Sequence, residues 1–270
     1  MSPGVVEKFN PKKTSALTSQ RSLERGHRRG RHVPIHEITL EAVRKNAIQF
    51  GLATDLLYQV SAGKEASIFL ALWNGHPLIL KAYRYWTSAQ ARKKKGYFAP
   101  TQMEALAAKE FDILSLCYKA GVHVPTPVGR VGNYVTMRFI GDGIDTAPQL
   151  RDATLEDPEE ALDQILDDYF LMYTKVHYIH GDLSKYNILW WQGRAWIIDV
   201  PQAYRVDAWA NMEQVETLLS RDIRNVLSYF KRYGIRRDAD YIAEQFISEY
   251  TPHNLRNFQE SVGTPLWRRR

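Results

Sequence analysis

The chain has 270 residues, of which 44% are hydrophobic and 24% are charged, a composition typical of a globular protein with a sizeable core. The single cysteine, Cys117, excludes an internal disulfide and a cysteine-based zinc site. No apolar run approaches the roughly 18 residues that a membrane span needs. We therefore expect a cytoplasmic protein without a membrane partner.

The net charge of +6 is concentrated near the amino terminus. Residues 1–32 hold eight lysines and arginines against two glutamates, so the rest of the chain is close to neutral. A segment of this composition cannot bury a core, and we expect residues 1–34 to form a flexible tail. The charge fits a solubilising arm and an arm that binds RNA phosphates equally well.

Residues 35–137 predict a β-rich lobe. Apolar runs and turn signals predict a five-stranded antiparallel sheet with one helix inserted after the third strand. A short helix over 38–50 precedes the sheet, and Gly51 closes it. The strands are expected at 56–60, 67–72, 78–83, 126–131 and 134–139, and the inserted helix at 103–119.

The connection over residues 84–102 is unusual in its length and charge. It carries five basic side chains and no acidic one. Connections inside compact domains are rarely this long, so the segment indicates either a functional loop or disorder.

A hinge at 138–143 leads into a mainly helical lobe over residues 144–270. Asp157 as N-cap, followed by Pro158 and Glu160, predicts the start of a helix. The helices are expected at 158–176, 211–233 and 239–250, and a pair of strands at 188–191 and 195–199. The fold class is therefore α+β, with two lobes.

The loop from His180 to Asn187 reads HGDLSKYN and leads into a predicted strand. Phosphoryl transfer needs a carboxylate that positions or accepts the acceptor proton and an amide oxygen that helps to hold a metal, and Asp182 and Asn187 supply both. Asp199 ends the next strand, where a carboxylate can hold Mg²⁺ on the phosphates. Each residue alone also fits a turn or cap, but their order along the chain favours a phosphotransferase.

Two upstream features support this interpretation. Lys81 stands between apolar residues of a predicted strand, and Glu110 in the following helix is its natural partner for positioning the α- and β-phosphates. An edge-strand lysine and a solvated helix face would explain the same two residues. The loop with Ser61, Gly63 and Lys64 can offer a hydroxyl, a close-approaching backbone and a cation to phosphate, although it has one glycine rather than three.

Together these motifs resemble the RIO family of atypical serine protein kinases, and most of all its type-one branch, which lacks an amino-terminal winged helix. The resemblance covers about residues 38–233 and includes GKEA at 63–66, MRFIG at 137–141, HGDLSKYN at 180–187, IDVPQ at 198–202 and LSRDI at 219–223. It implies a two-lobed, protein-kinase-like fold without a long activation segment.

The resemblance also implies roles and partners. The cofactors would be ATP and Mg²⁺, with Mn²⁺ as an alternative, and the acceptor would be a protein, including the chain itself. Family members act in maturation of the small ribosomal subunit, so a pre-ribosomal particle or rRNA, reached through the basic tail, is an implied partner. The implied catalytic residues are Asp182 and Asp199, the metal ligands Asn187 and Asp199, and the nucleotide-binding residues Ser61, Gly63, Lys64, Lys81, Glu110, Arg138, Phe139 and Ile140.

Other function classes stay open at this point. Small-molecule kinases of the aminoglycoside and choline kinase type share the H-G-D-L-x-x-x-N loop, although they usually have Trp, Phe or Glu where this chain has Val200. A nucleotide-dependent assembly factor would use the same residues to bind ATP without transferring phosphate. The chain also departs from its relatives at Arg138, where an acid is usual, and at Lys185, where Glu is commoner.

Overall fold

The computed structural model describes residues 6–8, 39–63, 65–83, 100–253 and 255. The chain divides into two compact units, described separately below. Unit 1 comprises residues 1–119 and 124–147, and unit 2 comprises residues 120–123 and 148–270. Lys64, most of the basic tail and nearly all of the basic connection lie outside the described residues.

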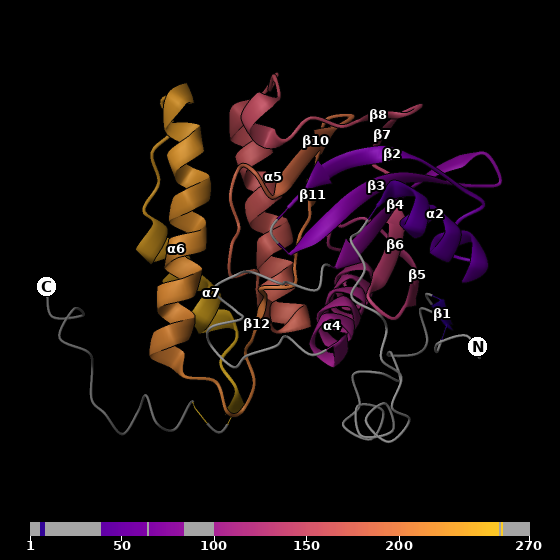
Figure 1. Cartoon of the computed structure of the whole chain (residues 1–270). Helices are drawn as coiled ribbons and strands as arrows, with labels where there is room; N and C mark the ends of the chain where they lie inside the picture. Colours follow the sequence, from indigo (N-terminus) through magenta and orange to yellow (C-terminus); the bar gives the residue numbers. More distant parts are fainter. Residues whose placement is uncertain (1–5, 9–38, 64, 84–99, 254, 256–270) are drawn as a thin grey trace, which may run out of the picture. The chain divides into compact units, whose positions relative to one another are not determined.

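Unit 1 is built on one antiparallel sheet whose strand order is β1-β5-β6-β4-β3-β2 (Figure 1). The five predicted strands are all present, which confirms the predicted sheet. Their bounds are Asp55–Ala62 (β2), Ala66–Trp73 (β3), His76–Tyr83 (β4), Pro127–Val131 (β5) and Tyr134–Arg138 (β6). In addition, a short strand, Val6–Lys8 (β1), pairs with β5. The sequence placed this strand in the flexible tail, because three residues are too few to show a strand pattern.

Two helices accompany the sheet in the described part of unit 1. The first, α2, spans Leu40–Gln49; the Thr39 side chain accepts a hydrogen bond from Ala42 N, and Val43 and Ala47 are buried. The second, α4, spans Pro100–Lys119 and packs against β4, β5 and β6. Both helices were predicted. A two-residue ladder follows the sheet, formed by Gly141–Asp142 (β7) and Asp145–Thr146 (β8).

The described part of unit 2 contains three α-helices and two small ladders, and Figure 1 labels the three helices. The helices are Pro158–Leu171 (α5), Met212–Phe230 (α6) and Ala239–Glu249 (α7). The strands are Tyr178–Ile179 (β9), Ile188–Trp191 (β10), Arg194–Ile197 (β11) and Tyr204–Arg205 (β12), with β10 paired to β11 and β9 to β12. Single 3-10 turns cover Leu150–Asp152 and Lys231–Tyr233.

The start of α5 follows the sequence prediction closely. The side chain of Asp157 accepts a hydrogen bond from Glu160 N, and Pro158 occupies the first turn. The predicted end at 176 is also reached, but the last turn, Met172–Val176, is a π-helix that stops at His177 in the left-handed conformation. Among the described residues, no helix combines the length and the apolar character needed to cross a membrane.

Candidate active site

The loop between β9 and β10 holds Asp182 and Asn187 side by side. The Asn187 side-chain nitrogen donates to the Asp182 carbonyl oxygen (2.8 Å) and to its carboxylate Oδ2 (3.1 Å). The Asn187 backbone N–H donates to Ser184 O at 2.9 Å, which closes the loop as a turn. Because the amide nitrogen of Asn187 is engaged by Asp182, its oxygen is the atom that remains for a metal.

Asp199 follows the strand β11 and is tied to the same loop through its neighbour. Ile198 N donates to Asn187 O at 3.0 Å, and Ile198 O accepts from the Nε2 of His180 at 2.9 Å. Asp199 itself has φ +65°, a left-handed conformation that Asp and Asn adopt more readily than other side chains. Thus Asp182, Asn187 and Asp199 belong to one hydrogen-bonded assembly within unit 2.

His180 connects the backbones of this assembly and is fully buried. Its Nε2 faces a carbonyl oxygen and its Nδ1 lies 3.3 Å from Asp182 N, so the ring is a donor at Nε2 and an acceptor at Nδ1. Burial lowers the pKa of His180, although the nearby carboxylates of Asp182 and Asp199 oppose this effect. The ring is therefore neutral and serves to fix the loop.

Asp222 on α6 fixes the same loop from the other side. Its Oδ2 accepts hydrogen bonds from Gly181 N (2.7 Å) and from the hydroxyl of Tyr169 on α5 (2.9 Å). Arg221 donates to Gly181 O and lies 3.4 Å from the second oxygen of Asp222. Asp222 has no exposed surface, and burial raises its pKa. Asp222 is thus a buried carboxylate with three partners, and it fixes the backbone of Gly181, the residue before Asp182.

Gly181 is required at this position for two reasons. Its φ of +81° is in the left-handed region, and a Cβ atom would lie 2.7 Å from Gln202 O. Gly181, Arg221 and Asp222 belong to the sequence motifs, but the motifs alone do not indicate a role for them. A charged residue between Leu219 and Ile223 on the apolar face of a helix was the available signal, because such a residue needs a buried partner.

In unit 1, Lys81 and Glu110 form a buried ion pair with an Nζ to Oε1 distance of 2.7 Å. Their side chains are only 8% and 1% exposed. The hydroxyl of Tyr83 donates to the other carboxylate oxygen of Glu110 at 2.5 Å, a contact that the sequence did not predict. Lys81 lies on β4, between β3 and β6, so the alternative of an edge-strand lysine is wrong.

The other predicted nucleotide-binding residues also lie in unit 1. Ser61 is exposed at the end of β2, and Gly63 N donates to Ala66 O at 2.9 Å across the β2–β3 turn. In the hinge, Arg138 N donates to Thr126 O (2.8 Å), and Ile140 O accepts from Ala147 N (2.9 Å). Adenine would therefore have to use other backbone groups of Arg138, Phe139 and Ile140.

The chemistry of the unit 2 assembly suits a magnesium ion. Within the described residues, no three His, Cys, Asp or Glu side chains gather as a metal-binding cluster. Magnesium usually takes one or two carboxylates and completes its shell with waters and substrate phosphates. Asp199 and the amide oxygen of Asn187 fit this pattern, and they do not fit a metal that needs a full protein cage.

Several known proteins are similar to this chain in sequence. A sequence profile of the RIO domain matches residues 68–242. The chain is 30% identical over 197 residues to the RIO-type serine/threonine-protein kinase Rio1 of Haloferax volcanii, covering 68% of this chain and 66% of that protein. It is also 30% identical over 191 residues to the serine/threonine-protein kinase RIO1 of Caenorhabditis elegans, covering 65% and 37%.

The fold agrees with a solved structure. The Rio2 kinase of Chaetomium thermophilum, in its ADP/Mg²⁺-phosphoaspartate complex, matches with a TM-score of 0.60 at 18% identity, over 90% of this chain and 79% of that one. The two-unit α+β architecture is thus kinase-like. The chain spans 66% and 37% of the length of the two curated relatives above. Because the profile covers more than half of its residues, the chain belongs to the RIO family of atypical protein kinases.

Proposed function

We propose that the chain is an ATP- and Mg²⁺-dependent serine/threonine protein kinase that also hydrolyses ATP and phosphorylates itself. The observation that carries the proposal is the assembly of Asp182, Asn187 and Asp199 around the β9–β10 loop. Hydrogen bonds of 2.7–3.3 Å join these residues and their loop, and the assembly would supply a carboxylate for the acceptor proton and oxygen ligands for magnesium. These are the groups that phosphoryl transfer requires from a protein.

The nucleotide would be held by the residues of unit 1. Lys81, fixed by Glu110, is the cation for the α- and β-phosphates, and Ser61, Gly63 and Lys64 would cover the phosphates. The backbone at Arg138–Ile140 would meet adenine. A bound Mg²⁺ would neutralise charge on the phosphates and orient them, with Asn187 and Asp199 as its protein ligands.

Asp182 would accept the proton of the attacking hydroxyl when a serine or threonine is the acceptor. The hydroxyl oxygen forms a bond to the γ-phosphorus while the bond to the β–γ bridging oxygen breaks, and ADP leaves. For self-phosphorylation, the carboxylate of Asp199 would be the attacking group and would form an acyl phosphate. Water would then hydrolyse the acyl phosphate and release inorganic phosphate, so that the cycle amounts to ATP hydrolysis. The solved Rio2 complex contains a phosphoaspartate, which supports this route.

The test is the chemical nature of the phosphoryl-enzyme. Incubation with γ-labelled ATP should give a label that hydroxylamine removes, and Asp199→Asn should abolish both the label and most of the magnesium-dependent nucleotide affinity. Asp182→Asn should keep nucleotide binding and slow transfer roughly 10²–10⁴-fold. Asp207→Asn, at a half-buried aspartate of unit 2 outside the proposed site, is the control. Normal ATP binding and full activity in both site variants would refute the site.

The proposed cellular role is maturation of the small ribosomal subunit, with rRNA or a pre-ribosomal particle as partner of the basic tail. An assembly factor that only binds nucleotide is the rival. Single-turnover ATP hydrolysis, measured with and without small ribosomal subunits, separates the two, because the rival predicts no hydrolysis under either condition. The family match speaks against a small-molecule kinase.

A further inference from the structure

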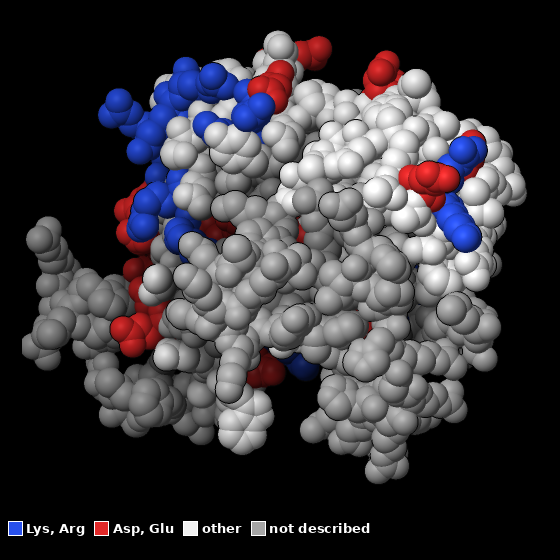
Figure 2. All heavy atoms as spheres, viewed as in Figure 1, with Lys and Arg blue, Asp and Glu red and all other residues white. Residues whose placement is uncertain are grey.

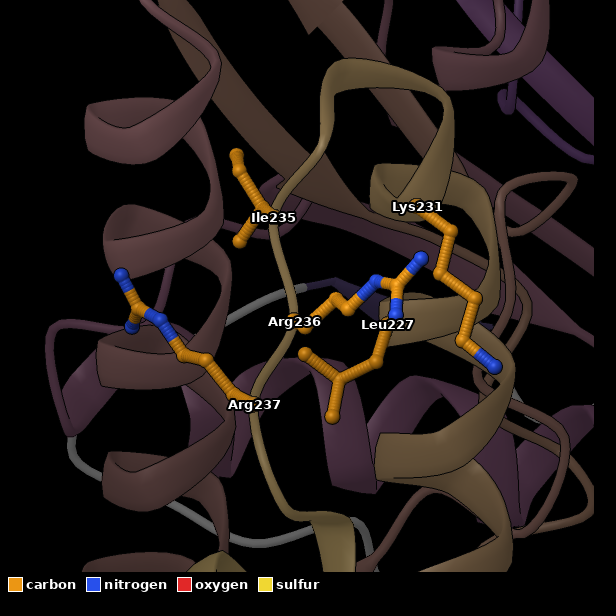
Figure 3. Close-up of a pocket in the computed structure, with 5 residues that line it drawn as sticks. All are labelled: Leu227, Lys231, Ile235, Arg236 and Arg237. Carbon is orange, nitrogen blue, oxygen red and sulfur yellow. The ribbon is translucent and has the colours of Figure 1, made fainter.

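A basic hollow in unit 2 has no part in the proposed catalysis. It has a volume of about 360 Å³, lies where α6 ends, and is called here the α6 hollow. Figure 3 shows the side chains that line it, which are Leu227, Lys231, Ile235, Arg236 and Arg237.

The local backbone explains why these cations meet. After α6, a 3-10 turn ends at Gly234, whose φ of +82° reverses the chain, and Ile235 is then buried as an anchor. The reversal brings Arg236 back beside Lys231. In Figure 3 these two side chains reach to the same side of the returning chain, whereas Arg237 reaches to the opposite side.

The three cations differ in their partners. Arg237 is neutralised by two carboxylates of α5, with 2.5 Å to Asp163 and 2.6 Å to Glu159. Within the described part of the chain, no carboxylate forms an ion pair with Lys231 or Arg236. The positive charges of Lys231 and Arg236 repel each other, and an anion bound between them would attract both. The lining therefore indicates an anionic ligand.

The surroundings indicate what kind of anion. Arg232 lies over the ring of Tyr229, 5.0 Å from its centroid, and the neighbouring Tyr233 is 37% exposed. Figure 2 shows lysine and arginine side chains gathered at the upper left, over the end of α6. Cations beside an accessible aromatic ring suit single-stranded nucleic acid, in which phosphates alternate with bases that can stack. An acidic peptide would use the cations and leave the ring without a role.

We propose that the α6 hollow binds the backbone of a single-stranded nucleic acid. Lys231 and Arg236 each contact a phosphate, and Tyr233 provides a ring for a neighbouring base. The contacts are to backbone and base faces, so binding is independent of sequence. This proposal does not depend on the catalytic assignment, because neither cation belongs to the nucleotide or metal site.

The test is a salt titration of binding to a fluorescent 20-nucleotide oligouridylate, using the full chain. The variant Lys231→Gln/Arg236→Gln should bind roughly 10- to 30-fold more weakly at 0.1 M salt, and its salt slope should fall by about 1.4, which is two phosphate contacts at about 0.7 each. The matched control, Arg44→Gln/Arg205→Gln, removes the same charge from two exposed cations that already pair with aspartates. The control should retain most of the affinity.

A third variant separates stacking from charge. Tyr233→Leu should lower the affinity roughly fivefold or more while the salt slope stays the same. The charge variants should keep the wild-type unfolding temperature, whereas Tyr233→Leu also loses ring contacts with Tyr229 and Phe230 and is compared at a temperature at which it is folded. All variants should keep the wild-type rate of ATP hydrolysis. Equal binding by the hollow variant and the control would overturn the proposal. Competition by uridine monophosphate as strong as by the oligomer would also overturn it, because the ligand would then be a small phosphate compound.

Discussion

Glu110 is a buried charged residue of unit 1 that accepts hydrogen bonds from two donors. Its two carboxylate oxygens bind Lys81 and Tyr83. A buried carboxylate is tolerated only while it keeps its partners. Lys81, which would bind the nucleotide phosphates, therefore also stabilises the fold. A lysine beside a glutamate could be anticipated from sequence, whereas the tyrosine could not, since it reads as one more apolar strand residue.

Changing Lys81→Met should lower the free energy of unfolding by about 3–5 kcal/mol, because Glu110 stays buried without its cation. The double variant Lys81→Met/Glu110→Leu should recover most of this loss, although the hydroxyl of Tyr83 then lacks its acceptor. Urea unfolding measures both values, and both variants should fail to bind ATP. If the single variant were as stable as the wild type, the pair would be better solvated than its 2.7 Å geometry and burial indicate.

Asp222→Asn should lower kcat by roughly 10- to 100-fold and leave the KM for ATP nearly unchanged, because the carboxylate positions the loop with Asp182 and touches no nucleotide. Its folded-state pKa is raised, so ionised Asp222 costs stability as the pH rises through that pKa. The uncharged amide of the Asp222→Asn variant removes the cost of burying a charge, but it loses one hydrogen bond. The unfolding temperature at neutral pH should therefore change little. A large drop in that temperature with normal kcat in the folded fraction would make Asp222 purely structural.

Elements with a strong local pattern were the predictable ones. The five strands of the sheet, and the start of α5 at Asp157 and Pro158, follow from alternation and capping residues. The pairing of β9 with β12 and the pairing of β7 with β8 were not predicted, because strands of two residues are too short to show an alternating pattern. The link from Gly181 to Asp222 was missed for another reason, since it joins residues that are far apart in sequence. The proposed metal and catalytic residues could be named from the sequence because their loop and strand motifs are local.

The connection from β11 to α6 is the element that limits how an acceptor can bind. Residues 198–211 hold one two-residue strand, β12, and lead directly into α6. A peptide kinase uses a long activation segment and following helices to support its substrate. We therefore expect poor activity on free serine peptides and measurable self-phosphorylation, compared in one assay with equal ATP. Rapid turnover of short peptides would contradict this expectation.

The charge of the molecule as a whole resides in the tail rather than in its folded units. Deleting residues 1–32 should leave ATP binding intact, because none of the proposed nucleotide-binding residues lies in this segment. If the tail contacts rRNA, the deletion should flatten the salt dependence of RNA binding by about 0.7 for each phosphate contact that is lost. Fluorescence titrations at several salt concentrations measure this slope. An unchanged slope would leave the tail with a solubilising role.

Deleting residues 1–32 also removes the strand β1. Val6–Lys8 pairs antiparallel with Gly129–Val131 on the outer side of β5. Without it, β5 becomes an open sheet edge, and such an edge is a template on which a second chain can add a strand. The shortened protein should therefore remain folded yet self-associate as its concentration rises, which light scattering would show. We therefore expect the first residues of the chain to protect this sheet edge from aggregation.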